Sequence, residues 1–480
     1  MRRLGLTLAV LGFVGCGDGA PTSDGGRPDA AMLAPWPHTL PASETLGTRG
    51  DLVVSRTILH AHSPISHDAC DGMGFADGQI ADTDCLAHLR SAVCSLHIDV
   101  LNLTDHAAHI SELSFEELFS KDSADDEVRN EAGELVATRV HCADGSTTLI
   151  TVGSENELMP VGLHRHVVED ATIRESAYHA DGPAAVSTFH EAGALVFVPH
   201  TEQRSLDYLR MLGADGMEIY NIHANVDLDI RPMWLGLGAT DYIGELLKFT
   251  NRATGLEPDL SFLAFFSENQ NDLGKWDALL ADGHALTAIA GSDCHENSFP
   301  MRMPDGERGD SYRRMMRWFT NHLLVHERSY EGQREALLAG RSYVAFEVFG
   351  SPVGFAFTAQ DEAETFEMGD TASLGSSLHV MRPTLSSDMP STPAPTITLR
   401  ILKAEAEGAV VVASGIEDVF AFTPSEAGAY CAEVRIVPSH ARPYLGAEAD
   451  LLVHDYVWIY SNAIFVGATE RLRSISRLPR

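Results

Sequence analysis

Short apolar runs alternate with amphipathic stretches along most of this 480-residue chain, and this alternation restricts its fold more than any other feature. The runs are rich in β-branched and aliphatic residues, which favours buried strands. They span 52–59, 98–104, 148–153, 194–198, 216–220 and 285–290. Amphipathic stretches of helical period lie at about 80–96, 182–193, 202–213, 271–283, 311–325 and 330–340. Strands that alternate with helices predict an α/β fold with a parallel sheet, and we expect a barrel over 51–345.

Beyond about residue 346 the pattern changes to β runs joined by connections rich in Pro, Ser and Thr. Candidate strands lie within 396–401, 429–437 and 456–466. This texture predicts a C-terminal β-sandwich domain over 346–480 that packs against the α/β domain. Tyr456, Trp458 and Tyr460 alternate along one strand and share a face, which we expect to lie in a core or an interface.

The first 16 residues have the composition of a targeting signal. A basic pair precedes an apolar run from Leu4 to Val14 that is too short to span a bilayer. The run ends in Phe-Val-Gly-Cys, which resembles a bacterial lipoprotein signal with Cys16 as the lipidated residue; a plain secretory signal is the alternative. Residues 17–50 are rich in Gly, Pro, Ala, Ser and Asp and predict a flexible tether. We therefore expect an exported cell-envelope lipoprotein, periplasmic or at the cell surface, held to the membrane only by its lipid anchor.

The charge balance narrows the possible partners. Asp and Glu total 68 against 34 for Lys and Arg, which gives a formal net charge of −34. Neither a phosphate backbone nor an anionic lipid surface would attract such a chain, so we expect no nucleic-acid partner. A small-molecule substrate remains compatible with this charge, because a local metal ion can override the global field.

The cysteine spacing predicts disulfides rather than a cysteine-ligated metal. Six cysteines remain besides Cys16, four of them between 70 and 142, and none has the CxxC spacing of a zinc ribbon. In an exported protein we expect one or two bridges among these four. Cys294 and Cys431 are expected to be free thiols.

Metal-ligand residue types fall just past the ends of five of the six predicted strands. The clusters are His60-Ala61-His62, Thr104-Asp105-His106, Gly153-Ser154-Glu155, Pro199-His200 and Gly291-Ser292-Asp293-Cys294-His295. Strand ends converge on one face of a β/α barrel, and a His-x-His pair on extended chain presents both imidazoles to the same side. Imidazoles combined with carboxylates suit zinc, manganese or iron. The sequence therefore predicts a metal centre at this face.

These clusters resemble the motifs of the PHP (polymerase and histidinol phosphatase) family over about 52–345, and Gly-Ser-Asp-x-His is the most specific of them. The resemblance implies a distorted (β/α)7 barrel with two or three divalent metal ions in a cleft. It also implies a ligand set. His60, His62, Glu155 and Asp293 would hold one metal, Glu155 and His200 a second, and His106 and His295 a third.

Two ligand positions stay open in this resemblance. Relatives have an Asp or His five or six residues after the first His-x-His, and here His67 and Asp68 both qualify. Relatives also place a His between the Glu and the His of the next strand, where His164 and His166 are candidates and His166 is preferred.

Residues around the ligands have expected roles as well. We expect Asp105 to accept a hydrogen bond from a ligand imidazole rather than to bind metal. His109 and His223 are expected to lie in the surroundings or on the surface. A cationic side chain should assist a phosphoryl substrate, and Arg302 is the first candidate, ahead of Arg204 and Arg165.

The activity we expect is metal-dependent hydrolysis, first of all of a phosphoester, by a metal-activated hydroxide. Asp293 and Glu155 would hold the metals that carry out catalysis, with Arg302 beside them. Two alternatives remain. Some PHP relatives and the amidohydrolase superfamily, which shares the His-x-His motif, cleave non-phosphate esters or amides. The chain could also be a catalytically inactive binding module of the envelope that retains the barrel as a scaffold, and metal content distinguishes this case from an enzyme.

Overall fold

All six strands predicted between residues 52 and 290 are present in the computed structural model, which describes residues 33–362 and 364–467. The signal segment with Cys16 and residues 17–32 of the expected tether lie outside the described residues. The strands are β2 (Leu52–Ala61), β5 (Val100–Leu103), β8 (Thr147–Val152), β10 (Leu195–Val198), β11 (Gly216–Asn221) and β12 (Thr287–Gly291). Strands β2, β5 and β8 pair in parallel, as do β10, β11 and β12. The expected α/β fold with parallel strands is confirmed.

The ladders form two sheets rather than one closed barrel. One sheet contains β2, β5 and β8, and the other has the order β12-β11-β10-β9, in which β9 (Met159–Val161) is antiparallel to β10. Backbone hydrogen bonds join the edges of these sheets. Leu163 N donates to Val152 O at 2.8 Å on one side, and on the other Asp293 N donates to His60 O at 3.1 Å. The described strands therefore do not pair into one closed (β/α)7 barrel. Backbone hydrogen bonds nevertheless join the two sheets at their edges.

The helices follow the amphipathic pattern except in one stretch. They include α1 (Thr83–Ser95), α4 (Pro183–Glu191), α5 (Leu206–Leu212), α8 (Gln270–Ala281), α9 (Tyr312–Trp318) and α10 (Tyr330–Ala339). The single helix predicted over 311–325 ends at Trp318, and Thr320–Val325 forms strand β13 instead. Strand β13 is buried at every position and pairs with β2 and with β14 (Ser342–Ala345). Backbone partners on both sides outweigh the helical pattern of the sequence.

Side-chain caps fix where several of these helices begin. Asp82 accepts a hydrogen bond from Cys85 N at the start of α1, and Ser329 accepts one from Gly332 N at the start of α10. Helix α10 is capped at its C-terminal end by Gly340, whose φ of 77° is readily adopted only by glycine. The remaining α-helices are α2 (Ala107–Ile110), α3 (Ala171–Tyr178), α6 (Ile230–Trp234), α7 (Ile243–Lys248) and α11 (Ala449–Leu452).

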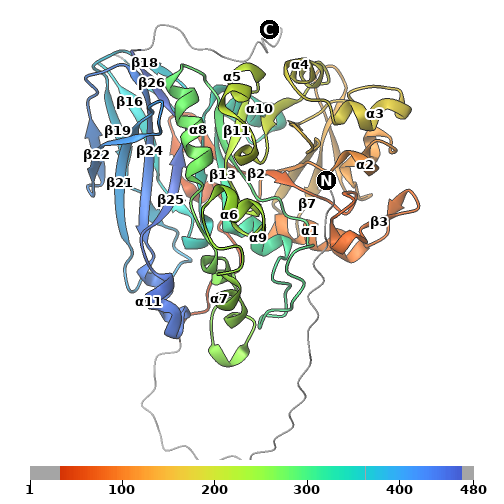
Figure 1. Ribbon diagram of the computed structural model, residues 1–480, viewed down its shortest axis with the longest axis horizontal. Coiled ribbons are helices and arrows are strands. Elements are labelled where there is room, and N and C mark those ends of the chain that lie inside the picture. Colours follow the sequence, from red (N-terminus) through yellow and green to blue (C-terminus); the bar gives the residue numbers. More distant parts are fainter. Residues whose placement is uncertain (1–32, 363, 468–480) are drawn as a thin grey trace, which may run out of the picture. The chain divides into compact units, whose positions relative to one another are not determined.

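The sheet that contains β2 continues into the C-terminal part of the chain (Figure 1). Strand β14 pairs with β25 (Tyr456–Ser461), β25 with β24 (Gly428–Val437), and β24 with β21 (Thr396–Lys403). The boundary expected at 345/346 thus falls within a continuous sheet. A further sheet in the C-terminal part of the chain has the order β17-β16-β19-β23. Its strands are β16 (Ala356–Gln360), β17 (Thr365–Phe366), β19 (Ser377–Met381) and β23 (Val419–Phe422).

The remaining strands extend these sheets or form short pairs. They are β1 (Thr48–Arg49), β3 (Phe75–Ala76), β4 (Gln79–Ile80), β6 (Asp126–Arg129), β7 (Leu135–His141), β15 (Pro352–Val353), β18 (Thr371–Ala372), β20 (Thr384–Leu385), β22 (Val410–Gly415) and β26 (Ile464–Val466). Tyr456, Trp458 and Tyr460 on β25 are buried, as expected for a face in a core.

The segment from Trp36 onward differs from the flexible tether expected over 17–50. Trp36 is 2% exposed, and its ring lies 5.9 Å from that of His440 and 5.0 Å from that of Tyr444. Leu40 and Leu46 are equally buried. The free energy gained by burying these three apolar side chains fixes a segment whose Gly- and Pro-rich composition alone suggests mobility.

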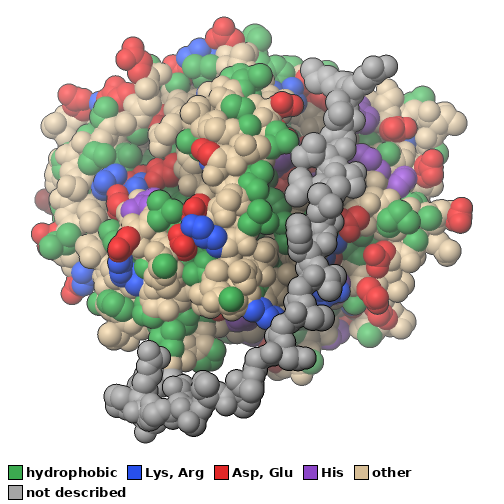
Figure 2. Space-filling model, turned by 60° about the horizontal axis from the view of Figure 1, so that its bottom comes forward, with side chains coloured by type: hydrophobic (Ala, Val, Ile, Leu, Met, Phe, Trp, Pro, Cys, Tyr) green, Lys and Arg blue, Asp and Glu red, His purple; other side chains and the backbone are tan. Residues whose placement is uncertain are grey.

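The cysteine predictions are confirmed. Cys70 is bonded to Cys85 and Cys94 to Cys142, whereas Cys294 and Cys431 are free and buried. Among the residues that the structure describes, no helix has the length and apolar character needed to cross a bilayer. On the face drawn in Figure 2, acidic side chains are spread among hydrophobic and polar ones with fewer Lys and Arg between them, in line with the negative formal charge.

We predict that Asn462→Ala destabilises the protein strongly, because this buried amide joins β12 to β14. Its Oδ1 accepts from Ala288 N at 2.8 Å, and its Nδ2 donates to Ala288 O and Ser342 O, each at 3.0 Å. The variant leaves the backbone of Ala288 unpaired and should lower the free energy of unfolding by about 2–4 kcal/mol in urea titrations. The exposed cap Asn251 is the control, and its replacement by Ala should cost at most about 1 kcal/mol. Equal losses would contradict this role of Asn462.

Candidate metal centre

Most of the predicted ligands meet where the strands end. Donor atoms of three overlapping groups lie within 4.8 Å of one another: His60, His62 and Glu155; His60, His200 and Asp293; and His62, Asp68, His106 and His295. We call these eight residues the ligand cluster. Because His60 and His62 each belong to two groups, the three groups form one continuous set of donors.

The His-x-His pair lies at the centre of the ligand cluster. Both imidazoles are fully buried at the end of β2, and their Nε2 atoms are 3.2 Å apart. Asp293 Oδ1 lies 3.3 Å from Nε2 of His60 and 3.4 Å from Nε2 of His62. Two nitrogens and one carboxylate oxygen thus face a common point, as in a metal site with nitrogen and oxygen ligands.

Four imidazoles of the cluster are held through Nδ1 and present Nε2. The Nδ1 contacts are His60 to Glu218 Oε1 at 2.7 Å, His62 to Ser66 Oγ at 3.2 Å, His106 to Glu155 O at 2.8 Å and His295 to Asp293 O at 2.7 Å. Metal-binding histidines are oriented in this way by a hydrogen bond at the second ring nitrogen. Nε2 of His295 is buried and has no hydrogen-bond partner among the described residues. The donor set therefore fits divalent metal ions.

Two ligand-cluster residues have left-handed backbones. His200 has φ of 46° and Asp293 has φ of 48°, values that are uncommon outside glycine. The turn at His200 is fixed because its N–H donates to Glu218 Oε2 at 2.9 Å. Such conformations concentrate at functional sites, where the surrounding structure holds them in place.

The charges of the cluster balance one another. Burial lowers the pKa of His62 to about 3, and the neighbouring His295 acts in the same direction. Burial would also lower the pKa of His106, but the carboxylates of Asp68 and Glu155 outweigh it and raise this pKa to about 9. Burial acts to raise the pKa of Asp293, yet His60 and His295 hold it well below its usual range. The carboxylates are therefore ionised, which is the state that binds metal.

The structure separates the candidates for the two open positions. Asp68 joins the cluster, with Oδ2 at 3.5 Å from His106 Nε2 and Oδ1 at 3.6 Å from His295 Nε2. The exposed His67 lies beside the ring of His106, with 5.0 Å between centroids, but belongs to none of the three groups.

The structure places His164 and His166 away from the cluster. His166 Nδ1 contacts the Tyr178 hydroxyl and Nε2 contacts Leu113 O, both at 3.0 Å, so both ring nitrogens are occupied. His164 contacts Glu134 and Tyr330. The physical reason is strand direction. These residues follow β9, which runs antiparallel to β10, so the end of β9 lies beside the start of β10 rather than beside its end.

His223 lies in the surroundings of the candidate ligands, as expected, whereas Glu218 was not predicted from the sequence. His223 follows the end of β11; its Nδ1 lies 3.0 Å from Asp293 Oδ2, and its Nε2 lies 3.3 Å from Asp227 Oδ2. The rule that candidate ligands follow strand ends also applies to His223, which comes two residues after β11. Glu218 was detectable as the one charged residue inside the predicted strand 216–220.

Asp105 has a different partner from the imidazole expected for it. Its Oδ1 accepts from Ser63 N at 2.6 Å and its Oδ2 from Ser63 Oγ at 2.7 Å. Burial raises the pKa of Asp105 to about 7 despite these hydrogen bonds. Asp105 thus fixes the backbone next to His62 and acts on the ligand through the chain.

The three candidate arginines all donate to backbone carbonyls. Arg302 is exposed and donates to Gly306 O at 2.8 Å; the acceptors of Arg204 and Arg165 are the carbonyls of Glu157 and Glu191. A further set of possible ligands, His38, Asp259 and Asp305, shares no residue with the cluster. Its Asp259 already accepts hydrogen bonds from Arg313 and Arg314, so this carboxylate is neutralised by arginine.

Comparison with known proteins gives only distant likenesses. No protein-family model matches the chain, and no curated protein matches it. Among solved structures, a two-domain protein from Bacteroides vulgatus containing a predicted PHP-like metal-dependent phosphoesterase is 14% identical, with a TM-score of 0.32, covering 88% of this chain and 99% of its own. PsfC from Pseudomonas syringae is 13% identical, with a TM-score of 0.31, covering 56% of this chain and 82% of its own. At TM-scores this low, the likeness supports no conclusion about this chain.

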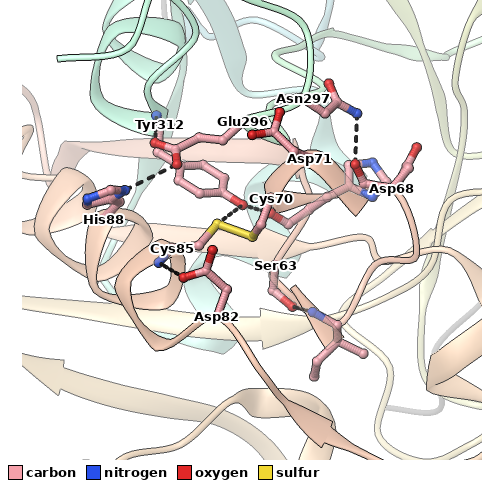
Figure 3. Close-up of a disulfide and its surroundings, with 12 residues drawn as sticks. Ser63, Asp68, Cys70, Asp71, Asp82, Cys85, His88, Glu296, Asn297 and Tyr312 are labelled. Carbon is pink, nitrogen blue, oxygen red and sulfur yellow. Dashed lines mark hydrogen bonds and ion pairs between the residues drawn. A yellow bond between two sulfur atoms is a disulfide. The ribbon is translucent and has the colours of Figure 1, made fainter. Parts of the chain in front are cut away.

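The Cys70–Cys85 disulfide fastens the loop that carries Asp68 (Figure 3). Cys70 N donates to His295 O at 2.8 Å, and Asn297 Nδ2 donates to Asp68 O at 3.1 Å. Cys85 belongs to α1, so the disulfide attaches the loop that carries Asp68 to this helix. The second disulfide, Cys94–Cys142, lies near the starts of β5 and β8, whereas the ligands follow strand ends.

We predict that the double variant Cys70→Ser/Cys85→Ser loses metal from the group that contains Asp68. Freeing the loop removes the constraint on Asp68 and should weaken binding of one metal equivalent by about tenfold or more. Chelator competition followed by mass spectrometry measures the loss. Cys94→Ser/Cys142→Ser is the matched control, because it also loses a disulfide, worth about 2–5 kcal/mol of stability. It should retain its metal, and equal losses in both variants would refute the link.

We also predict that metal affinity rises with pH up to about 9. The His106 imidazole carries a proton below its pKa of about 9, so metal binding at neutral pH must displace that proton. Each displaced proton should raise the apparent affinity by about tenfold per pH unit. Competition with a chelating dye between pH 6.5 and 9.5 measures this slope, after correction for the dye. An affinity that does not change with pH would contradict the prediction, and His106→Gln should make the slope shallower, since the raised pKa values of His60 and His200 leave further protons to displace.

Proposed function

We propose that this chain is a metal-dependent hydrolase that cleaves phosphoesters at a centre of two or three divalent metal ions. The observation that carries the proposal is the overlap of three donor groups whose members are buried or partly buried, in which four imidazoles are anchored at Nδ1 and present Nε2. When bound there, zinc, manganese or iron would lower the pKa of water and stabilise negative charge on a phosphoryl group. The PHP-like motifs favour phosphoesters over other substrates.

The distances suggest how the residues divide among the metals. His60, His62, Glu155 and Asp293 would hold the first. Glu155 reaches towards a second, because its Oε1 lies 3.3 Å from His200 Nε2. Asp68, His106 and His295 would hold the third.

His223 is the residue we propose beside His200 in place of His164 or His166. The rings of His200 and His223 are 5.3 Å apart and approach the same carboxylate, Asp293. Asp227 holds the far nitrogen of His223, as oxygens hold the second nitrogen of His60, His62, His106 and His295. The side chain of His223 is 42% exposed, so it lies where the cluster opens to solvent and substrate.

Recognition of the phosphoryl group would then depend on the metals more than on arginine. Arg302, Arg204 and Arg165 donate to backbone carbonyls and belong to none of the donor groups. The negative charge of a phosphoester would be met by the metals and by the imidazoles around them. We retain Arg302 as a candidate only for contacts with a larger substrate.

We propose that the protein works outside the cytoplasm as a cell-envelope lipoprotein. Two disulfides support an oxidising compartment, because cytosolic proteins seldom keep such bonds. The apolar leader and Cys16 supply the signal and the lipidation site. The expected contact with the membrane is limited to that lipid.

We predict that Asp293→Asn abolishes hydrolysis while the fold is retained. The variant replaces a carboxylate that faces both imidazoles of the His-x-His pair, and kcat/KM should fall by about a hundredfold or more. Asp215→Asn is the matched control, because Asp215 is a buried aspartate paired with His190 at 2.7 Å outside the ligand cluster.

The assay uses a panel of phosphomonoesters and phosphodiesters, followed by carboxyl esters and amides, with and without a chelator. Phosphoester turnover that stops with the chelator and in Asp293→Asn supports the proposal. Turnover of carboxyl esters alone would show that the enzyme hydrolyses carboxyl esters rather than phosphoesters. A folded, metal-loaded protein that turns over none of these substrates would favour a binding role instead.

A further inference from the structure

Glu218 contacts two parts of the candidate metal centre through its two carboxylate oxygens. The residue lies in β11 and is fully buried. Its Oε1 lies 2.7 Å from His60 Nδ1, and its Oε2 accepts from His200 N at 2.9 Å and from Asn221 Nδ2 at 2.8 Å. One side chain thus joins the ring of one candidate ligand to the backbone of another.

These contacts decide which nitrogen of His60 can bind metal. A carboxylate only accepts hydrogen bonds, so the proton of the His60 ring is placed on Nδ1. In the neutral ring, which is the form that binds metal, Nε2 then carries the lone pair and faces Asp293 and His62. Without an acceptor at Nδ1, the ring could take the other tautomer or rotate.

The second oxygen extends this control to two further histidines. His200 has a left-handed backbone, and the bond from its N–H to Glu218 holds that turn. Asn221, the other donor to Oε2, accepts from His223 N through its Oδ1 at 2.7 Å. Glu218 therefore acts on His60 and His200 directly and on His223 through Asn221.

The neighbouring strand is built to leave space for this carboxylate. Gly291 on β12 pairs with Asn221 of β11, and a Cβ added at Gly291 would overlap Glu218 Oε1. The register between β11 and β12 shifts just after Glu218, and such bulges change the direction in which a side chain points. The missing side chain at Gly291 and the shift in register together make room for the buried carboxylate of Glu218.

We propose that Glu218 is a positioning residue of the metal centre, which fixes the tautomer of His60 and the backbone of His200 so that both present Nε2. This inference rests on the proposed function and deepens it. Through Glu218, strand β11 would influence metal affinity although Glu218 itself does not bind the metal.

The test is the metal affinity of Glu218→Gln. Glutamine keeps the size of the side chain, but its NH2 group would face the N–H of His200 or the ring N–H of His60, so one contact is lost. The apparent Kd for zinc, measured by competition with a fluorescent chelator, should rise about 10- to 100-fold. Asn221→Ala is a milder second variant that removes one contact of the carboxylate, and it should weaken zinc binding by a smaller factor.

Glu347→Gln is the matched control. Glu347 is equally buried and lies 2.8 Å from His322 Nε2, but neither residue belongs to the ligand cluster. Its replacement should lower stability and leave the zinc affinity of the folded protein unchanged. Wild-type zinc affinity in both Glu218→Gln and Asn221→Ala would contradict the role proposed for Glu218. It would leave the proposed function of the chain unaffected. A wild-type protein that binds no zinc, manganese or iron would overturn the proposed function and this inference together.

Discussion

Two backbone hydrogen bonds between the end of β2 and the residues after β12 are the contacts on which the candidate site depends. Asp293 N donates to His60 O, and His62 N donates to Cys294 O, each at 3.1 Å. They join two separate sheets at the edge where the ligands emerge, so His60 and His62 from one sheet meet Asp293 and His295 from the other. A shift of one residue in this pairing would turn both imidazoles to the opposite face.

Burying so many ionisable groups is costly unless their charges are paired. The structure pairs them at short range: Asp293 lies between His60, His200 and His223, and Glu155 contacts His106 and His200. Without metal, protons on the imidazoles balance the carboxylates, and divalent ions would replace those protons. Charge pairing therefore lowers the cost of burying these groups together.

The strands and most of the cluster could be predicted because both obey local rules. Apolar runs mark buried strands, and polar residues just past their ends mark the face where parallel strands converge. His166 was preferred from the resemblance to PHP motifs, but that resemblance does not reveal that β9 runs antiparallel and ends on the other side. The prediction of one helix over 311–325 was wrong because β13 gains backbone hydrogen bonds from β2 on one side and β14 on the other. Glu218 stands out in the sequence as a charged residue inside an apolar strand, but its partner His60 is identified only by the structure.

Metal content tests the central claim, that the strand ends build a multinuclear metal site, most directly. The protein would be purified without residues 1–16 and without a histidine tag, and metals would be counted by mass spectrometry in the wild type and in Asp293→Asn. We predict two or three zinc, manganese or iron ions per wild-type chain and fewer in the variant. A folded wild-type protein that contains no metal, and takes up none on reconstitution with these ions, would contradict the claim.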